Sequence, residues 1–572
     1  MRPIVTSILA ALLGACATPP DSAAPHPAGT PAYRVEVPAI ERPGGETAAW
    51  WFRDGAAQAA AHGAMNGHAK NVIVFLGDGM SLATVAAARI LEGQRQGRPG
   101  EENRLAWEHF PNTALSRTYN TDAQTPDSAG TMSAIATGAK TRKGVVNVAQ
   151  SAVRGDCAAA LQAPLLSLWE LAAASGMATG VVTTARVTHA TPAATFAHSI
   201  DRDWESDGKL SRAARDAGCR DIARQLVETP FAQGFDVLMG GGRGYFLPAG
   251  QPDPEYPALT GRREDGRDLT AEWLRRHPGG TYAWNRAQFE AAPADKPLLA
   301  LFERTHMQFE HDRAGDAGGE PSLAEMTRAA IARLQHASAG NGDAGYVLLV
   351  EGGRIDHAHH YGNAHRALTD TIAMSDAVRA ALETTSADDT LVLVTADHAH
   401  TLTFAGYPVR GNPILGKVRG SSGEKGSDGL ARDALGLPYT TLAYANGPGY
   451  AGASTSQPEG PKRFLHEESD FEPAHGRTDL REVDTTDPDY LQESAVPLKS
   501  ETHGGQDVGV WALGPGSDAV RGSLEQNAIF HVLVQATPRL RQRLCDAGLC
   551  NDDGVPVELP DIADFAPAQS PL

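Results

Sequence analysis

Short apolar runs alternate with helical segments along most of this chain, and this alternation limits the folds that it can adopt. The runs at 71–76, 181–184, 346–350 and 390–395 are rich in valine, leucine and isoleucine. Segments of helical character lie before or after them, at 81–91, 167–174 and 322–336. Strands that are apolar on both faces are typical of parallel sheets covered by helices. The sequence therefore predicts an α/β fold with a central, largely parallel sheet and helices on both faces.

Charge and hydropathy exclude two classes of protein. The 572 residues carry a formal net charge of −19, so no nucleic-acid binding through phosphate contacts is expected. After residue 13 no apolar run approaches the roughly 18 residues that a membrane-spanning helix needs. What remains is a large, acidic globular protein.

The first residues are typical of an export signal. Arg2 precedes an apolar stretch at 4–13, and the sequence LGAC at 13–16 follows. This tetrapeptide resembles the lipobox of bacterial lipoproteins, and an ordinary signal peptide that contains a cysteine is the alternative. We expect a lipoprotein-type signal at 1–16 with a lipidated Cys16, then a proline-rich tether at 17–44. The protein would be exported to the periplasm or cell envelope, with membrane contact only through this anchor.

Four cysteines remain once Cys16 is set aside: Cys157, Cys219, Cys545 and Cys550. An even number of cysteines in an exported chain favours disulfides. Three pairings are possible, and the nearest spacings favour Cys157–Cys219 and Cys545–Cys550. A four-cysteine zinc site is the alternative, but the sequence has no Cys-x-x-Cys pair.

Two stretches break the alternation of strands and helices. Residues 411–429 are rich in glycine and serine, and residues 459–489 are acidic and punctuated by proline. We interpret 407–500 as a surface insertion in a domain that spans 45–550, with a C-terminal tail at 551–572. A helix at 46–62 should open the domain, and its Trp50 and Trp51 look exposed and mark a candidate contact with a partner.

Carboxylates and histidines collect where the predicted strands end. In an open α/β sheet, ligands bind outside the carboxyl ends of the strands, so polar residues there are candidate site residues. One aspartate after a strand is usually a helix cap, but here five segments coincide, which predicts a metal site. The candidates are Asp78, Arg186, His189, Glu351, Asp356, His357, His360, Asp397, His398 and His503.

The spacing of these residues indicates shared metal ions. Asp356 and His360 lie four residues apart, so on a helix both would face one ion. His357 and His359 would then point elsewhere, and His359 is expected beyond the ligands or at the surface. A solvated histidine-rich turn is the alternative for 356–360.

Residue chemistry indicates which ions these are. Asp397 and His398 can supply two ligands to one metal from a single turn. Histidines with carboxylates suit zinc, whereas Asp78, Glu351 and a hydroxyl suit a harder ion such as magnesium. Asp78 is central enough to bridge the two.

Ser128 is the candidate nucleophile. It follows Pro126 and Asp127 at the start of a helix of small residues, where backbone N–H groups and the positive end of the helix dipole lie near its oxygen. A simple N-cap is the alternative reading. Beside a zinc ion, however, the hydroxyl could attack phosphorus, and Arg186 could bind two phosphate oxygens.

At these residues the sequence closely resembles the alkaline phosphatases. The matching segments occur in family order, and weaker similarity covers about residues 46–550. The branch that includes the animal enzymes is the most similar, because His189 and His357 stand where the best-known bacterial enzyme has Asp and Lys. The segments are FLGDGM (75–80), PDSAGT (126–131), TARVTHATP (184–192), VEGGRIDHAHH (350–360), TADHAH (395–400) and ETHGG (501–505).

The resemblance implies a role for each position and two zinc ions with one magnesium ion. Thr191 stands where the animal enzymes have Ser and keeps the hydroxyl. One zinc would be held by Asp356, His360 and His503, the other by Asp78, Asp397 and His398, and magnesium by Asp78, Thr191 and Glu351. Ser128 would be the nucleophile, Arg186 would bind phosphate, and His189 and His357 would support them.

The resemblance also implies a calcium site and a homodimer. The segments GGRGYF (241–246), PDPEY (252–256) and LFE (301–303) match the calcium site of the animal branch. They give Glu255, Phe302 through its carbonyl, and Glu303. Glu320 stands where the family has Asp, in a loop with extra glycines. Residues 407–500 should correspond to the crown region at the family's dimer interface.

The implied function is hydrolysis of small phosphate monoesters at alkaline pH through a phosphoserine on Ser128. A phosphodiesterase on the same metal site is the nearer alternative. A sulfatase would need a formylglycine-type context that residues 127–130 lack. A non-catalytic lipoprotein that binds phosphate or metal is the further alternative, and it predicts a missing ligand or nucleophile, whereas all are present.

Overall fold

The computed structural model describes residues 33–231, 234–420 and 428–566. The predicted signal, Cys16 and residues 17–32 of the predicted tether lie outside the described residues.

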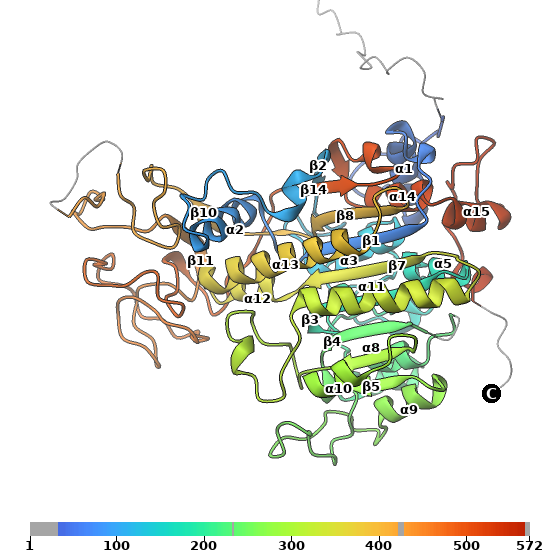
Figure 1. Ribbon diagram of the computed structural model, residues 1–572, viewed down its shortest axis with the longest axis horizontal. Coiled ribbons are helices and arrows are strands. Elements are labelled where there is room, and N and C mark those ends of the chain that lie inside the picture. Colours follow the sequence, from blue (N-terminus) through green and yellow to red (C-terminus); the bar gives the residue numbers. More distant parts are fainter. Residues whose placement is uncertain (1–32, 232–233, 421–427, 567–572) are drawn as a thin grey trace, which may run out of the picture. The chain divides into compact units, whose positions relative to one another are not determined.

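A 10-stranded sheet forms the centre of the molecule, in the order β15-β2-β14-β8-β1-β7-β3-β4-β6-β5 (Figure 1). Within the described residues, β14 alone runs against the other strands of this sheet. The predicted largely parallel sheet is therefore confirmed. Its strands are β1 (Asn71–Gly77), β2 (Asn112–Arg117), β3 (Ala178–Arg186), β4 (Val237–Gly241), β5 (Thr281–Ala283), β6 (Leu298–Leu301), β7 (Tyr346–Gly352), β8 (Thr390–Ala396), β14 (Val508–Leu513) and β15 (Gly522–Glu525).

Helices cover both faces, because alternate residues of the central strands are apolar on both sides. On β1, Ile73 and Phe75 pack with α2, α11 and α13, and Val72 and Val74 pack with α1, α3, α5 and α14 (Figure 1). The longer helices are α1 (Ala48–Ala61), α2 (Leu82–Arg95), α3 (Ser128–Thr137), α11 (Leu323–Gly340), α13 (Ala364–Thr384), α14 (Ala528–Ala536) and α15 (Pro538–Asp546). The shorter helices are α4 (Cys157–Ala160), α5 (Leu168–Ala174), α6 (Ala190–Ala193), α7 (Arg212–Asp216), α8 (Ile222–Val227), α9 (Leu269–Arg276), α10 (Arg286–Ala291) and α12 (Arg354–His360).

The exposure predicted for the first helix is wrong. Trp51 is only 1% exposed, because its ring packs between Arg42 and Lys140 and against the edge of Tyr119. The indole N–H of Trp50 donates to the carbonyl of Pro38 at 2.8 Å. Trp51 is therefore not available as the partner contact that the sequence suggested, whereas Trp50 is only partly buried.

The ends of the domain also differ from the prediction. Residues 33–44, the described part of the predicted tether, pack on the domain, with Tyr33 and Val35 against a buried cluster that includes α1. Val555 and Val557 of the predicted tail belong to the same cluster, and Phe565 is buried in the main core. The apolar side chains of both segments explain why they fold onto the domain.

The predicted disulfides Cys157–Cys219 and Cys545–Cys550 are both formed. The first joins α4 to the segment after α7, and the second closes a short loop after α15.

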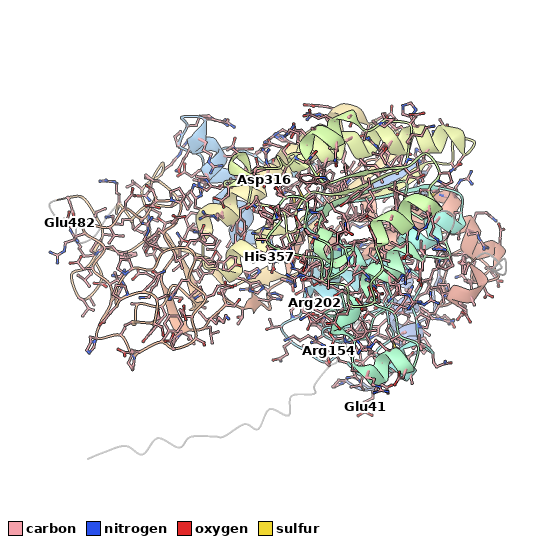
Figure 2. The ribbon with its side chains drawn as sticks, turned by 90° about the horizontal axis from the view of Figure 1, so that it is seen from below. Glu41, Arg154, Arg202, Asp316, His357 and Glu482 are labelled. Atoms are coloured by element: carbon pink, nitrogen blue, oxygen red, sulfur yellow. A yellow bond between two sulfur atoms is a disulfide. The ribbon has the colours of Figure 1, made fainter. Side chains whose placement is uncertain are left out.

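The predicted insertion lies apart from the main sheet. β10 (Leu402–Phe404), β11 (Leu442–Gly447) and β12 (Ser494–Pro497) form a separate three-stranded sheet. Most of the chain between them is irregular, and Figure 1 shows it extending beyond the end of the main sheet. Glu482 belongs to this insertion, and Figure 2 shows it far from Arg202 and His357. Among the described residues no helix has both the length and the apolar character needed to cross a membrane.

Candidate metal centre and active site

Ser128 begins α3 and lies at the edge of the sheet where the parallel strands end. Its side chain is buried, and the carboxylate of the N-cap residue Asp127 accepts hydrogen bonds from the backbone of Gly130 and Gly144. The Ser128 Oγ lies 3.1 Å from His398 Nε2 and 3.4 Å from Asp78 Oδ1. Ser128 thus begins a helix and contacts two of the predicted ligand side chains, and its role as nucleophile stays a prediction.

One cluster beside Ser128 comes from the ends of β1 and β8. Ligand atoms of Asp78, Asp397 and His398 all lie within 4.8 Å of one another. Asp397 Oδ1 accepts from the backbone N–H of Gly79 at 3.1 Å. Gly79 adopts φ +67°, and a Cβ there would lie 2.3 Å from His400 Cδ2. The position after Asp78 thus needs glycine, because a side chain at this positive φ would be strained and would collide with the ring of His400.

A second cluster combines α12 with β13 (His503–Gly504). Asp356 Oδ1 lies 3.4 Å from the Nε2 atoms of both His360 and His503, and these two nitrogens are 3.2 Å apart. Burial alone would raise the pKa of Asp356, but His360 and the neighbouring His400 and His503 hold it well below its ordinary value. The i, i+4 spacing on α12 therefore brings ligand atoms of Asp356 and His360 together, and their binding of one metal ion stays a prediction.

A third cluster lies between Asp78 and the end of β7. Ligand atoms of Asp78, His189 and Glu351 lie within 4.8 Å of one another. The hydroxyl of Thr183 donates to Glu351 Oε2, and Thr191 is close enough to lower the pKa of Glu351. His189, expected only to support the site, lies directly at this cluster.

The electrostatics of these clusters favour bound cations. Burial, followed by the charges of Asp397, Asp356 and Glu351, raises the pKa of Asp78 well above its ordinary value. Burial is also the main cause that raises the pKa of Glu351 to about 8. Burial lowers the pKa of His398 well below its ordinary value, so this imidazole is neutral. Buried carboxylates that repel one another beside neutral imidazoles are stabilised by positive ions.

Unsatisfied oxygen atoms mark the same place. Asp78 Oδ2, Glu351 Oε1 and Thr191 Oγ1 are buried without a hydrogen-bond partner among the described residues. Most buried polar atoms in proteins have a partner, and three such oxygens from separate segments are the donor set that magnesium prefers. These residues fit the hard-cation site that the family resemblance implies.

The guanidinium of Arg186, the predicted phosphate-binding group, is held by other side chains of the protein. Its Nε and Nη2 atoms donate to the two carboxylate oxygens of Glu205 at 2.7 and 2.6 Å, and its Nη1 contacts His306. Glu205 is buried, so it holds the guanidinium by a bidentate ion pair. The bidentate geometry expected toward phosphate is used inside the protein instead.

Arg202 is the arginine beside the nucleophile, and the sequence reasoning missed it. Its Nη1 donates to Asp127 Oδ2 at 3.0 Å, and its Nη2 lies 3.1 Å from His189 Nε2. Asp78 and Asp356 are near enough to raise its pKa. Figure 2 shows Arg202 and His357 close together in the body of the molecule. Arg202 follows no strand directly, so the strand-end rule could not find it.

His357 belongs to a group of imidazoles next to Arg202. Its ring centroid lies 4.0 Å from that of His306 and 5.3 Å from that of His189. His357 Nδ1 and His189 Nδ1 are both buried and have no hydrogen-bond partner among the described residues. Burial lowers the pKa of both rings well below the ordinary value.

His400 and Glu501 are further site residues without a predicted role. The imidazole of His400 donates from Nε2 to Asp356 at 2.7 Å and from Nδ1 to Glu501. Burial would lower the pKa of His400, but Glu501 and Asp356 raise it to about 10. His400 is therefore a cation that fixes the orientation of Asp356. The second histidine, two residues after His398, was the sequence signal that could have identified His400 as a site residue.

His359 lies away from the metal clusters, but it is buried rather than at the surface. Its ring nitrogens lie 3.0 Å from Thr84 Oγ1 and 2.7 Å from Tyr444 Oη. The ring stacks on His400 with centroids 4.9 Å apart. His359 thus helps to hold the ring of His400 in place.

Two of the predicted calcium residues, Glu255 and Glu303, lie together with a carboxylate that was not predicted. Ligand atoms of Glu255, Glu303 and Asp316 lie within 4.8 Å of one another, and Asp316 was not among the predicted residues. Burial raises the pKa of Glu255 to about 6 and that of Glu320 to about 9. Asp316 Oδ2 and Glu320 Oε1 are buried without a partner among the described residues.

One predicted calcium ligand is already engaged. The carbonyl of Phe302 accepts a hydrogen bond from Arg243 Nη1 at 2.9 Å, and Arg243 also pairs with Glu255 at 3.0 Å. The carboxylates of Glu303 and Asp316, with the longer arm of Glu320, are the donors that fit a calcium ion.

Comparison with known proteins connects this site to a family. The sequence model described as "Alkaline phosphatase" matches residues 69–538. The tissue-nonspecific alkaline phosphatase of Gallus gallus is 43% identical over 476 residues, covering 82% of this chain and 84% of that protein. The alkaline phosphatase of Gadus morhua is 42% identical over 475 residues, covering 82% of this chain and 91% of that protein.

Solved structures agree with this similarity. The alkaline phosphatase of Thermus thermophilus superposes with a TM-score of 0.57 at 26% identity, covering 83% of this chain and 92% of that chain. The enzyme from the Antarctic bacterium TAB5 has the same fold at a TM-score of 0.52 and 20% identity, covering 82% of this chain and 98% of that chain.

Proposed function

This chain belongs to the alkaline phosphatase family and hydrolyses phosphate monoesters, and from this premise we propose that Ser128 is the nucleophile. The observation that carries the proposal is the position of its Oγ, within 3.4 Å of ligand atoms of both Asp78 and His398. A buried hydroxyl at that position can form a phosphoester.

We propose that the three clusters hold two zinc ions and one magnesium ion. Asp356, His360 and His503 would hold one zinc, and Asp78, Asp397 and His398 the other, while Asp78, Glu351 and Thr191 would hold magnesium. When bound, such ions make an adjacent oxygen a stronger nucleophile and stabilise charge on the leaving oxygen and the phosphoryl group.

The chain's own residues bind and orient the phosphoryl group. The N-terminus of α3 places backbone N–H groups and the positive end of its dipole around Ser128. Asp127 contacts Arg202 at Nη1 and His189 contacts it at Nη2. A guanidinium has five N–H donors, so these two contacts leave others for phosphate oxygens. Arg202 therefore replaces Arg186 as the proposed phosphate-binding arginine.

The proposed reaction proceeds by two displacements at phosphorus. Ser128 Oγ, having lost its proton, forms a bond to phosphorus as the bond to the ester oxygen breaks, and the alcohol takes up a proton as it leaves. Water then forms the second P–O bond, the bond to Ser128 Oγ breaks, and inorganic phosphate is released. Two displacements give net retention of configuration at phosphorus. Arg202 is placed to stabilise charge on the phosphoryl oxygens in both steps.

Turnover of para-nitrophenyl phosphate against pH tests this function. Activity should rise into the alkaline range, disappear after chelation and return with zinc plus magnesium. Bis(para-nitrophenyl) phosphate distinguishes the diesterase alternative. Faster turnover of the diester than of the monoester would contradict the proposal.

We further propose that Glu255, Glu303, Asp316 and Glu320 hold a calcium ion. The support is the convergence of Glu255, Glu303 and Asp316, together with the buried, unpartnered oxygens of Asp316 and Glu320. Burial also raises the pKa values of Glu255, Glu303 and Glu320. Isothermal titration of chelated protein with calcium tests this site, and loss of binding in Glu303→Gln is the expected result.

A homodimer and an exported, lipid-anchored form are proposals that rest on other parts of the chain. Three apolar side chains near β10, Phe404, Tyr407 and Val409, are exposed, and Tyr407 is 89% exposed, so they are the proposed dimer contact. Sedimentation of the wild type and Tyr407→Ser tests it, with a monomeric variant as the expected result. Metabolic labelling with palmitate tests lipidation, which Cys16→Ser should abolish.

A further inference from the structure

One strand of the separate three-stranded sheet lies beside the segments that carry two of the site histidines. β11 is the middle strand of that sheet, between β10 and β12. Leu402 at the start of β10 pairs with Tyr444 on β11, and His400 lies only two residues before Leu402. β9 (Ala399–His400) in turn pairs with β13, where His503 is the register partner of His400. The sheet of the insertion is therefore continuous along the chain with the strands around the candidate metal ligands.

Asn446 on β11 exchanges two hydrogen bonds with Thr502, the residue before the candidate ligand His503. Its amide nitrogen donates to Thr502 Oγ1 at 3.0 Å, and its amide oxygen accepts from the backbone N–H of Thr502 at 3.0 Å. The same Thr502 hydroxyl donates to the carbonyl of His503 at 3.2 Å. Asn446 thus holds both the backbone and the side chain of Thr502, and through them the segment that presents the His503 imidazole.

Tyr444 supports another ligand of the same cluster. It lies two residues before Asn446 and therefore on the same face of the strand. Its Oη lies 2.7 Å from His359 Nδ1, and the ring of His359 stacks on that of His400. His400 in turn donates from Nε2 to Asp356 at 2.7 Å. All four of these side chains are buried, so a buried series of contacts connects β11 to a candidate metal-ligating carboxylate.

The other positions of β11 also fit closely against this part of the site. The backbone N–H of Ala445 donates to Thr401 Oγ1 at 3.3 Å, and Thr401 donates from its backbone N–H and its hydroxyl to Glu501 Oε1 at 2.6 and 2.5 Å. Gly447 adopts φ +127°, and a Cβ there would lie 2.9 Å from Glu501 Cβ. The carbonyl of Glu501 lies 2.5 Å from His360 Nδ1. Four successive residues of β11 therefore approach the segments that carry the ligands of one cluster.

The other proposed zinc cluster has no such connection. Among the residues that the structure describes, no hydrogen bond or ion pair joins Asp78, Asp397 or His398 to residues 402–498. Its support comes from the main domain, where Thr131 Oγ1 on α3 donates to Asp397 Oδ2 at 3.2 Å. A change in β11 should therefore affect one zinc site and not the other.

We propose that β11 positions the metal cluster of Asp356, His360 and His503, with Asn446 and Tyr444 as the positioning residues. Hydrogen-bonded residues around metal ligands fix the orientation of those ligands, and their loss lowers metal affinity. The inference rests on the proposed zinc assignment and goes beyond it, because it gives the insertion a role in holding one of the two zinc ions.

Zinc retention tests this role independently of turnover. Metal-loaded full-length protein is dialysed against chelator at graded concentrations, and elemental analysis gives the zinc per chain. Asn446→Ala should release one zinc at a chelator concentration about 3- to 10-fold lower than the wild type, the effect of losing about one neutral hydrogen bond. The other zinc should be retained as in the wild type. His503→Ala identifies the ion, because it should lack that zinc from the start and show no further change when combined with Asn446→Ala.

A second variant and two matched controls separate positioning from general stability. Tyr444→Phe removes only the hydroxyl and should weaken retention of the same zinc. Tyr490→Phe is its control, because the buried Tyr490 Oη has no partner among the described residues. Asn412→Ala is the control for Asn446→Ala, because the side-chain amide of Asn412 forms hydrogen bonds within the insertion. Both controls should retain zinc as the wild type does, and Asn412→Ala should lower the unfolding temperature.

A conservative variant and the contrary results complete the test. Asn446→Asp keeps an acceptor for the backbone N–H of Thr502 and should recover part of the zinc retention. Wild-type retention in both Asn446→Ala and Tyr444→Phe would overturn the inference, and with a wild type that holds two zinc ions and hydrolyses monoesters it would leave the proposed function intact. Release of both zinc ions together in these variants would also overturn it. A wild type that binds no zinc would overturn the inference and the proposed metal assignment together.

Discussion

Replacing Arg202 by alanine should reduce catalysis strongly, whereas replacing Arg186 should chiefly reduce stability. The two substitutions should have different effects because the two guanidinium groups have different partners. Arg202 contacts Asp127, the residue before the nucleophile, at 3.0 Å. Arg186 is held by Glu205 through two hydrogen bonds of 2.6 and 2.7 Å.

The expected magnitudes follow from these contacts. Arg202→Ala removes a charged donor aimed at charge that develops in the transition state, and loss of one such donor costs about 3–4 kcal/mol, or roughly 10²–10³ in kcat/KM. Arg186→Ala leaves the buried Glu205 carboxylate unpaired, which destabilises a protein by about 3–5 kcal/mol. The Arg186 side chain is 15% exposed, so we expect the lower end, about 3 kcal/mol.

Steady-state kinetics and urea unfolding measure the two effects. Arg202→Lys controls for charge, and it should recover part of the activity because it keeps the positive charge but loses the planar donor array. Glu205→Gln is the matched control for Arg186, and it should also lower stability with little effect on kcat/KM. A 100-fold loss of kcat/KM in Arg186→Ala at unchanged stability, with near-normal Arg202→Ala, would refute this reasoning.

Three further results are expected. His400→Ala should weaken zinc binding by about 10- to 100-fold, because outer partners of metal ligands have effects of that size, and zinc content after dialysis against a graded chelator measures it; unchanged content would argue against the positioning role. In chelated protein, the raised pKa values of Glu320 (about 9) and Glu255 (about 6) mean that the native state binds more protons than the unfolded state, so stability is lost as pH rises from about 5 to 9. Glu320→Gln should flatten this pH dependence of the unfolding temperature, and calcium should raise the unfolding temperature of the wild type more at pH 9 than at pH 6; a calcium effect independent of pH would contradict it. Glu351→Gln should lower magnesium affinity and leave zinc content unchanged, and elemental analysis that shows loss of zinc instead would place Glu351 in another site.

Much of the fold follows from the pattern of the sequence. The predicted run at 71–76 is one residue short of β1, and the run at 390–395 is one residue short of β8. Both are apolar strands bounded by turns, so periodicity and composition are informative. The short strands β5 and β15 lie at the two edges of the sheet and have no such pattern. Their positions depend on pairing with the neighbouring strand rather than on their own residues.

The clustering of the proposed metal ligands was predictable for a physical reason. Asp78, Asp397 and His398 directly follow strands whose carboxyl ends meet at one edge, so position along the chain nearly determines position in space. The family resemblance added Thr191, whose hydroxyl carries no signal of its own.

The residues around the proposed metal ligands could not be predicted by the same rule. Arg202 lies in a loop after α6, and the strand-end rule favoured Arg186 because that residue ends β3. Only the fold shows that Glu205 binds Arg186 and that Asp127 binds Arg202. Asp316 was missed for a similar reason, because its place beside Glu303 depends on the path of a glycine-rich loop.

The identity of the group that carries the phosphoryl intermediate is the central claim, and one measurement tests it most directly. Metal-loaded enzyme is mixed with ³²P-labelled phosphate monoester, quenched in acid and digested, and the labelled peptide is sequenced. The structure predicts label on Ser128, stoichiometric with the chain at saturation and absent from Ser128→Ala. Label on another residue, or equal label in the Ser128→Ala variant, would contradict the mechanism proposed for this enzyme.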